Sequence, residues 1–189
     1  MKTKKIKDNI TSSEFKHLIT YLKADDSVRT NRKNRLLKIF SLLYSTGIRI
    51  NEIQQINENH INELNENQKT IIVSHKQKTE KMIYSSKKNL KLIISYWNKN
   101  KGHTITSERN NKLHPVAMIQ DVNSYLKKVF PNKRITSHSF RQTLITELAT
   151  KGINTKIIQS LIGHKNINTT YRYIKVSEND ILNSLEVVR

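Results

Sequence analysis

One C-terminal stretch, residues 137–173, constrains the fold of this chain more than any other; it reads SHSFRQTLITELATKGINTKIIQSLIGHKNINTTYRY. Apolar residues recur at every fourth position of its first part, which predicts a helix that Gly152 ends with the positive φ favoured at a helix stop. A second helix, over about residues 155–162, is expected to bury Ile157 and its apolar neighbours and to stop at Gly163 in the same way. The stretch therefore predicts helices joined by glycine turns.

Four polar side chains of phosphate-binding or nucleophilic chemistry stand at the ends of these predicted helices. His138 and Arg141 share one edge of a first turn, because residues three apart on a helix are neighbours. His164 follows a glycine at the exposed head of a turn, and Tyr173 belongs to a third, short helix. Two imidazoles, a guanidinium and a phenol in such places could hold a phosphate by charge and attack it with an oxygen.

These residues resemble the C-terminal catalytic motif of the tyrosine recombinases, the phage-integrase family. HSFR is similar to its H-x-x-R element, LIGH to its L-[LI]-G-H element, and Tyr173 lies nine residues after His164. Upstream, YSTGIRINEI at residues 44–53 resembles the family's T-G-x-R-x-x-E box. The segment VSHKQKTEKMIY resembles the β-hairpin that carries the catalytic lysine. The resemblance covers nearly the whole chain, with four motifs in the family's order.

The resemblance assigns a role to each upstream motif. It makes Arg49 the first catalytic arginine, which binds a non-bridging phosphate oxygen, and Glu52 the acid that holds its guanidinium. Counting back from Tyr84 places the catalytic lysine at Lys76, while a local K-T pair leaves Lys78 as the alternative. Without the family pattern, the first two residues would be interpreted as a surface ion pair, and the lysines as a charged turn that protects a sheet edge.

The chemistry that the resemblance implies is phosphoryl transfer to Tyr173 with no metal and no other cofactor. The two arginines would neutralise the phosphate, and His164 would donate a hydrogen bond to it. His138 would take the phenolic proton, and Lys76 would protonate the leaving 5′ oxygen. The resulting 3′-phosphotyrosyl link keeps the phosphodiester energy, so a hydroxyl of a second strand can reverse the step without ATP or Mg²⁺.

Charge points to a polyanionic partner independently of these motifs. Thirty-four Lys and Arg against 15 Asp and Glu give a formal charge of +19 and a pI near 10.1. The sequence has no Cys, no HExxH or other metal-binding spacing and no apolar run long enough to span a bilayer. We therefore expect intracellular work on nucleic acid, with no membrane attachment and no metal site. The family resemblance implies double-stranded DNA as the partner and a cytoplasmic, DNA-associated location.

Periodicity along the rest of the chain predicts a mainly α fold with a small antiparallel β-sheet, an α+β class that the resemblance narrows to the tyrosine recombinase catalytic-domain fold. Apolar repeats at helical spacing predict helices that carry residues 15–22, 31–45, 89–97 and 115–129. β-Branched runs predict one hairpin, from strands at residues 70–74 and 81–85.

Three segments make up the expected domain organisation. Residues 1–10 form a basic N-terminal arm, residues 11–175 the catalytic domain, and residues 176–189 a tail that docks on a neighbouring protomer or on its own core. The chain opens almost directly on the catalytic domain, as the compact invertases of fimbrial switches do. We expect either a minimal enzyme without the family's usual core-binding domain, or a fragment or degenerate relative. Gln142 also departs from the family pattern, since many members have a second His there.

The expected function is site-specific DNA recombination, by integration, excision or inversion. The resemblance further implies a homo-tetramer on paired recombination sites, with an accessory DNA-bending protein as a possible partner. Two other classes stay open. A helix-turn-helix regulator would use the helices of residues 155–173, with Arg172 and Lys175 reaching DNA, but it leaves the upstream basic residues unexplained. A type IB topoisomerase would use similar catalytic groups to relax DNA.

Overall fold

The computed structural model describes residues 8–73, 79–97, 105, 113–164 and 166–171, which fall into two compact units, one ending at Leu144 and the other beginning at Ile145. Unit 1 contains, in chain order, α1 (Ser12–Ala24), α2 (Thr30–Thr46), the 3₁₀ helix η1 (Ile50–Gln55), α3 (Glu58–Asn67), β1 (Lys69–Val73), β2 (Glu80–Tyr84), α4 (Lys87–Trp97) and α5 (Pro115–Val129). The boundary falls within α6 (Ser137–Thr150), and unit 2 continues with α7 (Thr155–Ile162) and α8 (Ile167–Tyr171).

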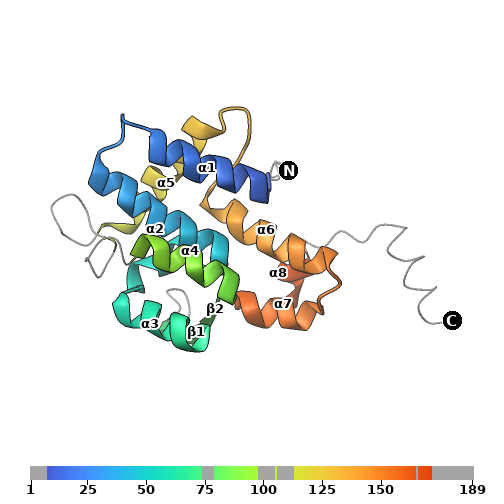
Figure 1. The fold of residues 1–189 in the computed structure, drawn as a ribbon. Coiled ribbons are helices and arrows are strands. Elements are labelled where there is room, and N and C mark those ends of the chain that lie inside the picture. Colours follow the sequence, from blue (N-terminus) through green and yellow to red (C-terminus); the bar gives the residue numbers. More distant parts are fainter. Residues whose placement is uncertain (1–7, 74–78, 98–104, 106–112, 165, 172–189) are drawn as a thin grey trace. The chain divides into compact units, whose positions relative to one another are not determined.

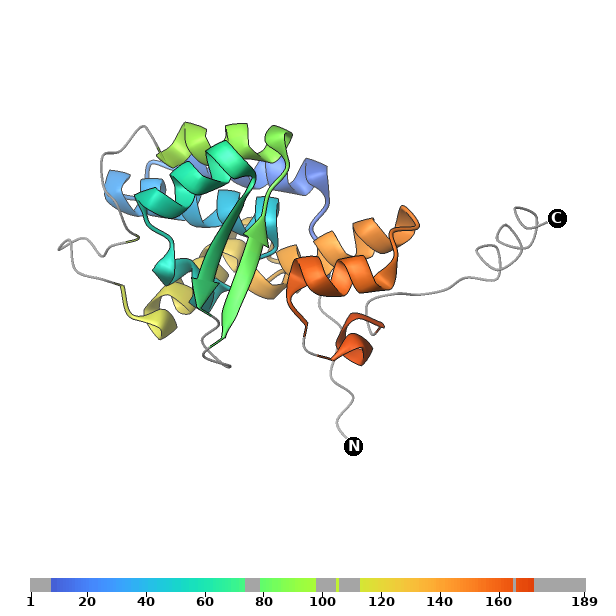
Figure 2. The ribbon, with the colours of Figure 1, turned by 90° about the horizontal axis from the view of Figure 1, so that it is seen from below.

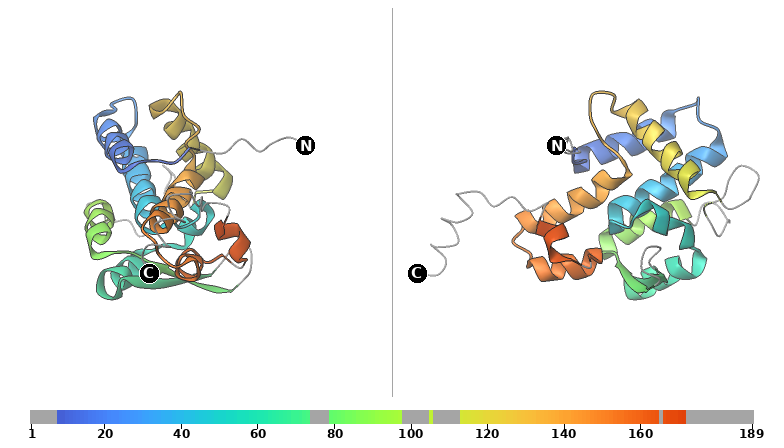
Figure 3. Two further views of the ribbon diagram at one scale, coloured as in Figure 1. Left: turned by 90° about the vertical axis from the view of Figure 1, so that its right-hand side faces the viewer. Right: turned by 180° about the vertical axis from the view of Figure 1, so that it is seen from behind.

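Helix α2 forms the centre of unit 1. Its buried residues run almost without interruption from Leu36 to Leu43, and α4 packs along it while α1 lies against it as well (Figure 1). Helix α5 contacts α1 and η1, as the view from behind in Figure 3 lets the reader follow. Phe140, near the start of α6, stacks on Phe40 with ring centroids 6.0 Å apart. The first residues of α6 thereby join the core of unit 1.

Local signals in the sequence explain where these helices begin and end. A capping box begins α1, because the Glu14 amide donates to Thr11 Oγ1 over 3.2 Å and the Thr11 amide donates to Glu14 Oε2 over 2.9 Å. Gly47 ends α2 in the left-handed region with φ 61°. Helix α3 was not expected from the apolar pattern; Asn57 caps it, and Ile61 and Leu64 are its buried residues.

The predicted hairpin is present, with each strand beginning one residue earlier than expected. The strands are antiparallel and pair Lys69 with Tyr84 and Ile72 with Lys81. Helix α3 packs against β1, beside the two strands in Figure 2. Alternation along the strands turns Ile72 and Ile83 inward, and it turns Lys81 inward too. A lysine therefore occupies a core-facing position of the sheet.

Unit 2 is built around α7, which packs against α8. Asn154 caps α7 by accepting from the Lys156 amide over 2.8 Å, and Gly163 ends it with φ 69°, as the sequence predicted. The expectation that Ile157 is buried was wrong, since its side chain is 58% exposed. Ile158 and Ile162, which are four residues apart and so lie on one face of the helix, are buried instead.

Candidate active site

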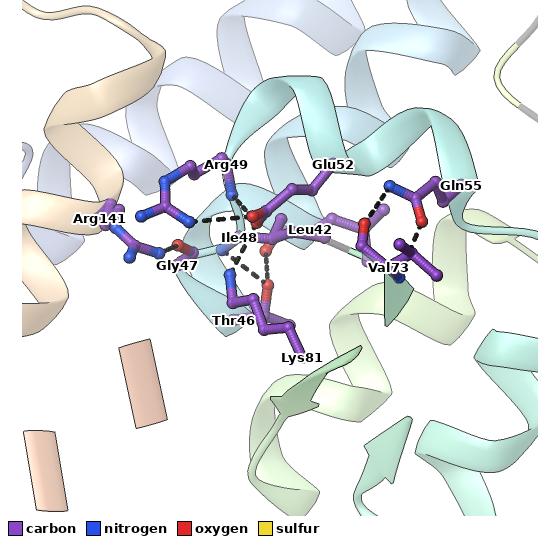
Figure 4. Close-up of polar contacts among 10 residues, drawn as sticks. All are labelled: Leu42, Thr46, Gly47, Ile48, Arg49, Glu52, Gln55, Val73, Lys81 and Arg141. Carbon is purple, nitrogen blue, oxygen red and sulfur yellow. Dashed lines mark hydrogen bonds and ion pairs between the residues drawn. The ribbon is translucent and has the colours of Figure 1, made fainter. Parts of the chain in front are cut away.

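The expected contact between Arg49 and Glu52 is present at the turn that follows Gly47. Arg49 Nη1 lies 3.0 Å from Glu52 Oε1, and the Arg49 backbone amide donates to Glu52 Oε2 over 3.0 Å (Figure 4). Glu52 is 1% exposed, whereas the Arg49 side chain remains 39% exposed. A buried carboxylate therefore fixes a half-exposed guanidinium, which differs from the surface ion pair that spacing alone would indicate.

A second cation, which the sequence did not single out, binds the same carboxylate. Lys81 Nζ lies 2.7 Å from Glu52 Oε2, and the lysine reaches it from β2 with a side chain that is 7% exposed (Figure 4). The two oxygens of Glu52 thus accept from three donors, of which two carry a full positive charge. The signal that could have found Lys81 is its inward position in the alternation of the strand.

Arg141 brings α6 to the same turn of unit 1. Its Nη1 donates to the carbonyl oxygen of Gly47 over 2.9 Å, and the residue is 2% exposed (Figure 4). The backbone carbonyl that it binds lies two residues before Arg49 in the chain. The turn after α2 therefore gathers the two arginines of the family motifs, which are far apart in sequence.

The pKa values of Lys81 and Glu52 reflect this gathering of charge. Burial is the main reason why the pKa of Lys81 falls to about 8; the Glu52 carboxylate raises it, and the positive charges of Arg141 and Arg49 lower it further. Burial raises the pKa of Glu52, but Lys81 and Arg49 together outweigh burial and hold it below its ordinary value. Three cations around one carboxylate leave a net positive charge that a phosphate could neutralise.

His138 occupies the first turn of α6, three residues before Arg141, as predicted. Its side chain is exposed, and its backbone amide donates to Thr136 Oγ1 over 3.3 Å. The amide of Ser137 donates to Asn123 Oδ1 over 2.9 Å. Two side-chain oxygens thus satisfy amides at the start of the helix that presents the His and the Arg.

His164 belongs to unit 2, where the structure corrects one expectation. The residue is 8% exposed rather than at the exposed head of a turn. Its Nδ1 lies 2.9 Å from the hydroxyl of Thr170, which is fully buried, and its backbone carbonyl accepts from Gln159 Nε2 over 2.8 Å. The hydroxyl of Thr170 holds the imidazole ring in one orientation, which a histidine that must address a ligand requires.

Three predicted site residues lie outside the described residues: Lys76, its alternative Lys78, and Tyr173. Within the described ranges, no three His, Cys, Asp or Glu side chains gather where they could hold a metal ion. Among the helices of these same ranges, none is long and apolar enough to cross a membrane.

The sequence is similar to a known family and to several curated proteins. A family model described as the phage integrase family matches residues 8–180. Tyrosine recombinase XerA of Pyrococcus horikoshii is 29% identical over 189 aligned residues, which are 97% of this chain and 62% of that protein. Tyrosine recombinase XerC of Leptospira interrogans is 26% identical over 184 residues, 94% of this chain and 58% of that protein. The chain thus spans about three fifths of the length of these curated relatives.

Solved structures share the fold. The crystal structure of XerA recombinase gives a TM-score of 0.71 at 19% identity, covering 99% of this chain and 67% of that one. A Tn1549 transposon integrase in complex with a circular intermediate DNA gives 0.76 at 17% identity, with 98% and 67% covered. A post-cleavage complex of XerH recombinase with a palindromic difH substrate gives 0.70 at 13% identity, with 95% and 52% covered. The predicted fold class is therefore confirmed.

Proposed function

The chain belongs to the phage integrase family, and from this premise we propose that it is a site-specific DNA recombinase that cleaves and rejoins strands through a covalent tyrosyl intermediate. The observation that carries the proposal is the cluster at the turn after α2. There Glu52, nearly inaccessible, fixes Arg49, and Arg141 binds the carbonyl of Gly47. A regulator that only binds DNA has no need of a buried acid to aim an arginine.

Charge balance at this cluster supports a phosphodiester as the substrate group. Two guanidiniums and the Lys81 ammonium exceed the one carboxylate in their midst, so an incoming phosphate would find unneutralised positive charge. Arginine holds its charge at any physiological pH and can bind two oxygens at once, which suits the extra negative charge of a phosphoryl-transfer transition state. We assign this role to Arg49 and Arg141.

The remaining groups would move the proton and break the bond. Tyr173 Oη attacks phosphorus and gives its proton to His138, the bond from phosphorus to the 5′ oxygen breaks, and that oxygen takes a proton from Lys76 or Lys78. His164 donates a hydrogen bond to the phosphate. The products are a 3′-phosphotyrosyl link and a free 5′ hydroxyl, and the reverse step with another strand completes exchange without a cofactor.

Double-stranded DNA is the proposed partner, for which the net charge of +19 provides a sequence-independent attraction. Strand exchange joins two sites, so the proposal includes a homo-tetramer on paired sites, with an accessory DNA-bending protein as a further partner. The expected division into an arm, a catalytic domain over residues 11–175 and a tail over 176–189 stays a prediction. The same holds for the cytoplasmic, DNA-associated location.

The experiment that tests the proposal uses a supercoiled plasmid that carries the genomic DNA flanking the gene. Incubation with the full chain is expected to yield inverted or excised products, and Arg141→Ala should abolish them while retaining most of the affinity for DNA. Relaxed plasmid without recombinants would favour a topoisomerase-like activity. Binding with neither relaxation, adduct nor recombinants would overturn the proposal in favour of a helix-turn-helix regulator.

A further inference from the structure

Two contacts fasten η1 to the β-hairpin, and we call them together the η1–hairpin clamp. One is the ion pair of Glu52 with Lys81 of β2, at 2.7 Å. The other is a pair of hydrogen bonds between Gln55 and Val73 of β1: Gln55 Nε2 donates to the Val73 carbonyl over 2.7 Å, and the Val73 amide donates to Gln55 Oε1 over 3.0 Å (Figure 4). Each strand of the hairpin is thus held once by the same short helix.

The two contacts of the clamp lie at either end of residues 74–78 in the sequence. Val73 is the last residue of β1, directly before residues 74–78, and Lys81 is the second residue of β2 after them. That intervening segment contains Lys76 and Lys78, the two candidates for the catalytic lysine. On the other side of the clamp, Glu52 also holds Arg49. The clamp therefore ties the two ends of the lysine-bearing segment to η1, the short helix whose Glu52 holds Arg49.

Stability alone gives a poor reason for a lysine at this place. The other inward residues of the two strands are Thr70, Ile72 and Ile83, and an apolar side chain at position 81 would continue that surface. Replacing a buried ion pair by packed apolar groups is often neutral or stabilising, because both charges must leave water. Lys81 nevertheless sits 8% exposed beside two arginines, where its charge is costly. Such a cost is typical of a group that serves a function.

We propose that Lys81 and Gln55 are positioning residues for the recombination reaction, which place the hairpin lysine relative to Arg49 by fastening both strands to η1. The inference rests on the proposed function. Lys81 is not the proton donor itself in this account, since its ammonium lies against Glu52 and its side chain is 7% exposed. Its effect on the reaction passes through Glu52 and through the placement of the hairpin.

The test measures single-turnover cleavage of a nicked suicide duplex, built from the junction that the plasmid assay identifies, by the full chain and its variants. Lys81→Met should slow cleavage by roughly 10-fold to 100-fold, as expected when a reacting group is displaced, with DNA affinity nearly unchanged. Lys81→Arg should recover most of the rate. Lys69→Met removes an exposed lysine from the same hairpin and should leave the rate unchanged.

A duplex with sulfur in place of the 5′-bridging oxygen separates positioning from proton donation, because the sulfur leaves without a proton. This duplex should not restore Lys81→Met, whereas it should restore the variant of the catalytic lysine. Restoration of Lys81→Met would show that Lys81 is the general acid and would overturn the positioning role. Gln55→Ala breaks the other half of the clamp without exposing a buried charge, and it should slow cleavage several-fold in a protein that remains folded.

The pH dependence of the cleavage rate is a further measurement. A lysine that only stabilised the fold would not change it. Burial lowers the pKa of Lys81, Glu52 of η1 raises it, and Arg141 of α6 and Arg49, the N-cap of η1, lower it further. Loss of its proton as the pH rises past about 8 should slow wild-type cleavage, and Lys81→Arg should move that decline to higher pH. Full-rate cleavage by both Lys81→Met and Gln55→Ala would refute the clamp. A wild-type protein that forms no adduct on either duplex would instead refute the proposed function, and this inference with it.

Discussion

Removing the carboxylate of Glu52 should destabilise the protein in a way that depends on pH. Glu52→Gln keeps the shape of the side chain but leaves Arg49, Lys81 and Arg141 around a neutral amide. Lys81 is the most affected of the three, because it is 7% exposed and Glu52 is the group that raises its pKa. Without that carboxylate, the pKa of Lys81 should fall further below its ordinary value.

The size of the effect follows from this shift. At pH 7 the wild-type lysine keeps its proton with a pKa about one unit above the pH, so its share of the loss is limited to about 1.4 kcal/mol, the cost of releasing that proton. The side-chain amide has one acceptor oxygen where the carboxylate has two, so the hydrogen bonds from the Arg49 amide and guanidinium cannot both be kept, which adds about 1–2 kcal/mol. We expect the free energy of unfolding to fall by about 3 kcal/mol at pH 7.

The stability of the wild-type protein should rise with pH as Lys81 loses its proton. An exposed lysine paired with an acid gives the opposite trend, because its pKa is raised by folding and stability falls when the proton is lost. The unfolded chain binds a proton at Lys81 up to pH about 10.4, whereas folded wild type releases it near pH 8, so stability rises with pH between these values. In Glu52→Gln this rise begins at lower pH. By pH 9 Lys81 is neutral in both folded proteins, and the difference between them should shrink by about 1.4 kcal/mol relative to pH 7.

Urea unfolding followed by circular dichroism at pH 7 and pH 9 provides the measurement. Glu66→Gln, which neutralises an exposed acid of α3, serves as the matched control and should change the free energy of unfolding by less than about 0.5 kcal/mol. The double variant Glu52→Gln with Lys81→Met should regain part of the loss, since the buried lysine is no longer left without its carboxylate. A loss below about 1 kcal/mol at pH 7, or one that is the same at both values of pH, would refute the reasoning.

Three further predictions concern DNA and catalysis. DNA affinity should fall steeply with salt, because many phosphates are contacted; a fluorescence-anisotropy titration that gives a slope near zero for log K against log[salt] would contradict this. Lys76→Ala should bind DNA almost as wild type does, yet cleave it about 10²-fold more slowly, and a 5′-bridging phosphorothioate should restore cleavage; if Lys78→Ala behaves so instead, Lys78 is the acid. Thr170→Val removes the hydroxyl 2.9 Å from His164 Nδ1 and should slow single-turnover cleavage by about 10-fold. An unchanged rate would show that this hydroxyl does not orient the His164 ring for the reaction.

Much of the fold could be predicted from local signals. The capping box at Thr11, the glycine stops at Gly47 and Gly163 and the β-branched hairpin all depend on residues close together in sequence, and each is present in the structure. Helix α3 was missed because only Ile61 and Leu64 mark its buried face among polar residues. Two apolar positions one turn apart are too few to define a helical period.

The surroundings of the site residues depended on tertiary contacts that no local pattern records. Lys81 was overlooked because lysine on a short strand usually faces water, and only the distant Glu52 explains its inward position. His164 was expected at an exposed turn, but the residue is 8% exposed and its Nδ1 lies 2.9 Å from the hydroxyl of Thr170. The motif spacing named the residues, whereas their burial and partners required the three-dimensional structure.

The identity of the nucleophile tests the central claim most directly. Tyr171 and Tyr173 are both candidates by proximity in sequence, and the spacing from His164 assigns the role to Tyr173. On a nicked suicide duplex, wild-type protein should form a covalent adduct that resists denaturation, Tyr171→Phe should retain it, and Tyr173→Phe should abolish it, with peptide mapping locating the DNA on Tyr173. An adduct that survives Tyr173→Phe and disappears in Tyr171→Phe, or one mapped to another residue, would contradict the account.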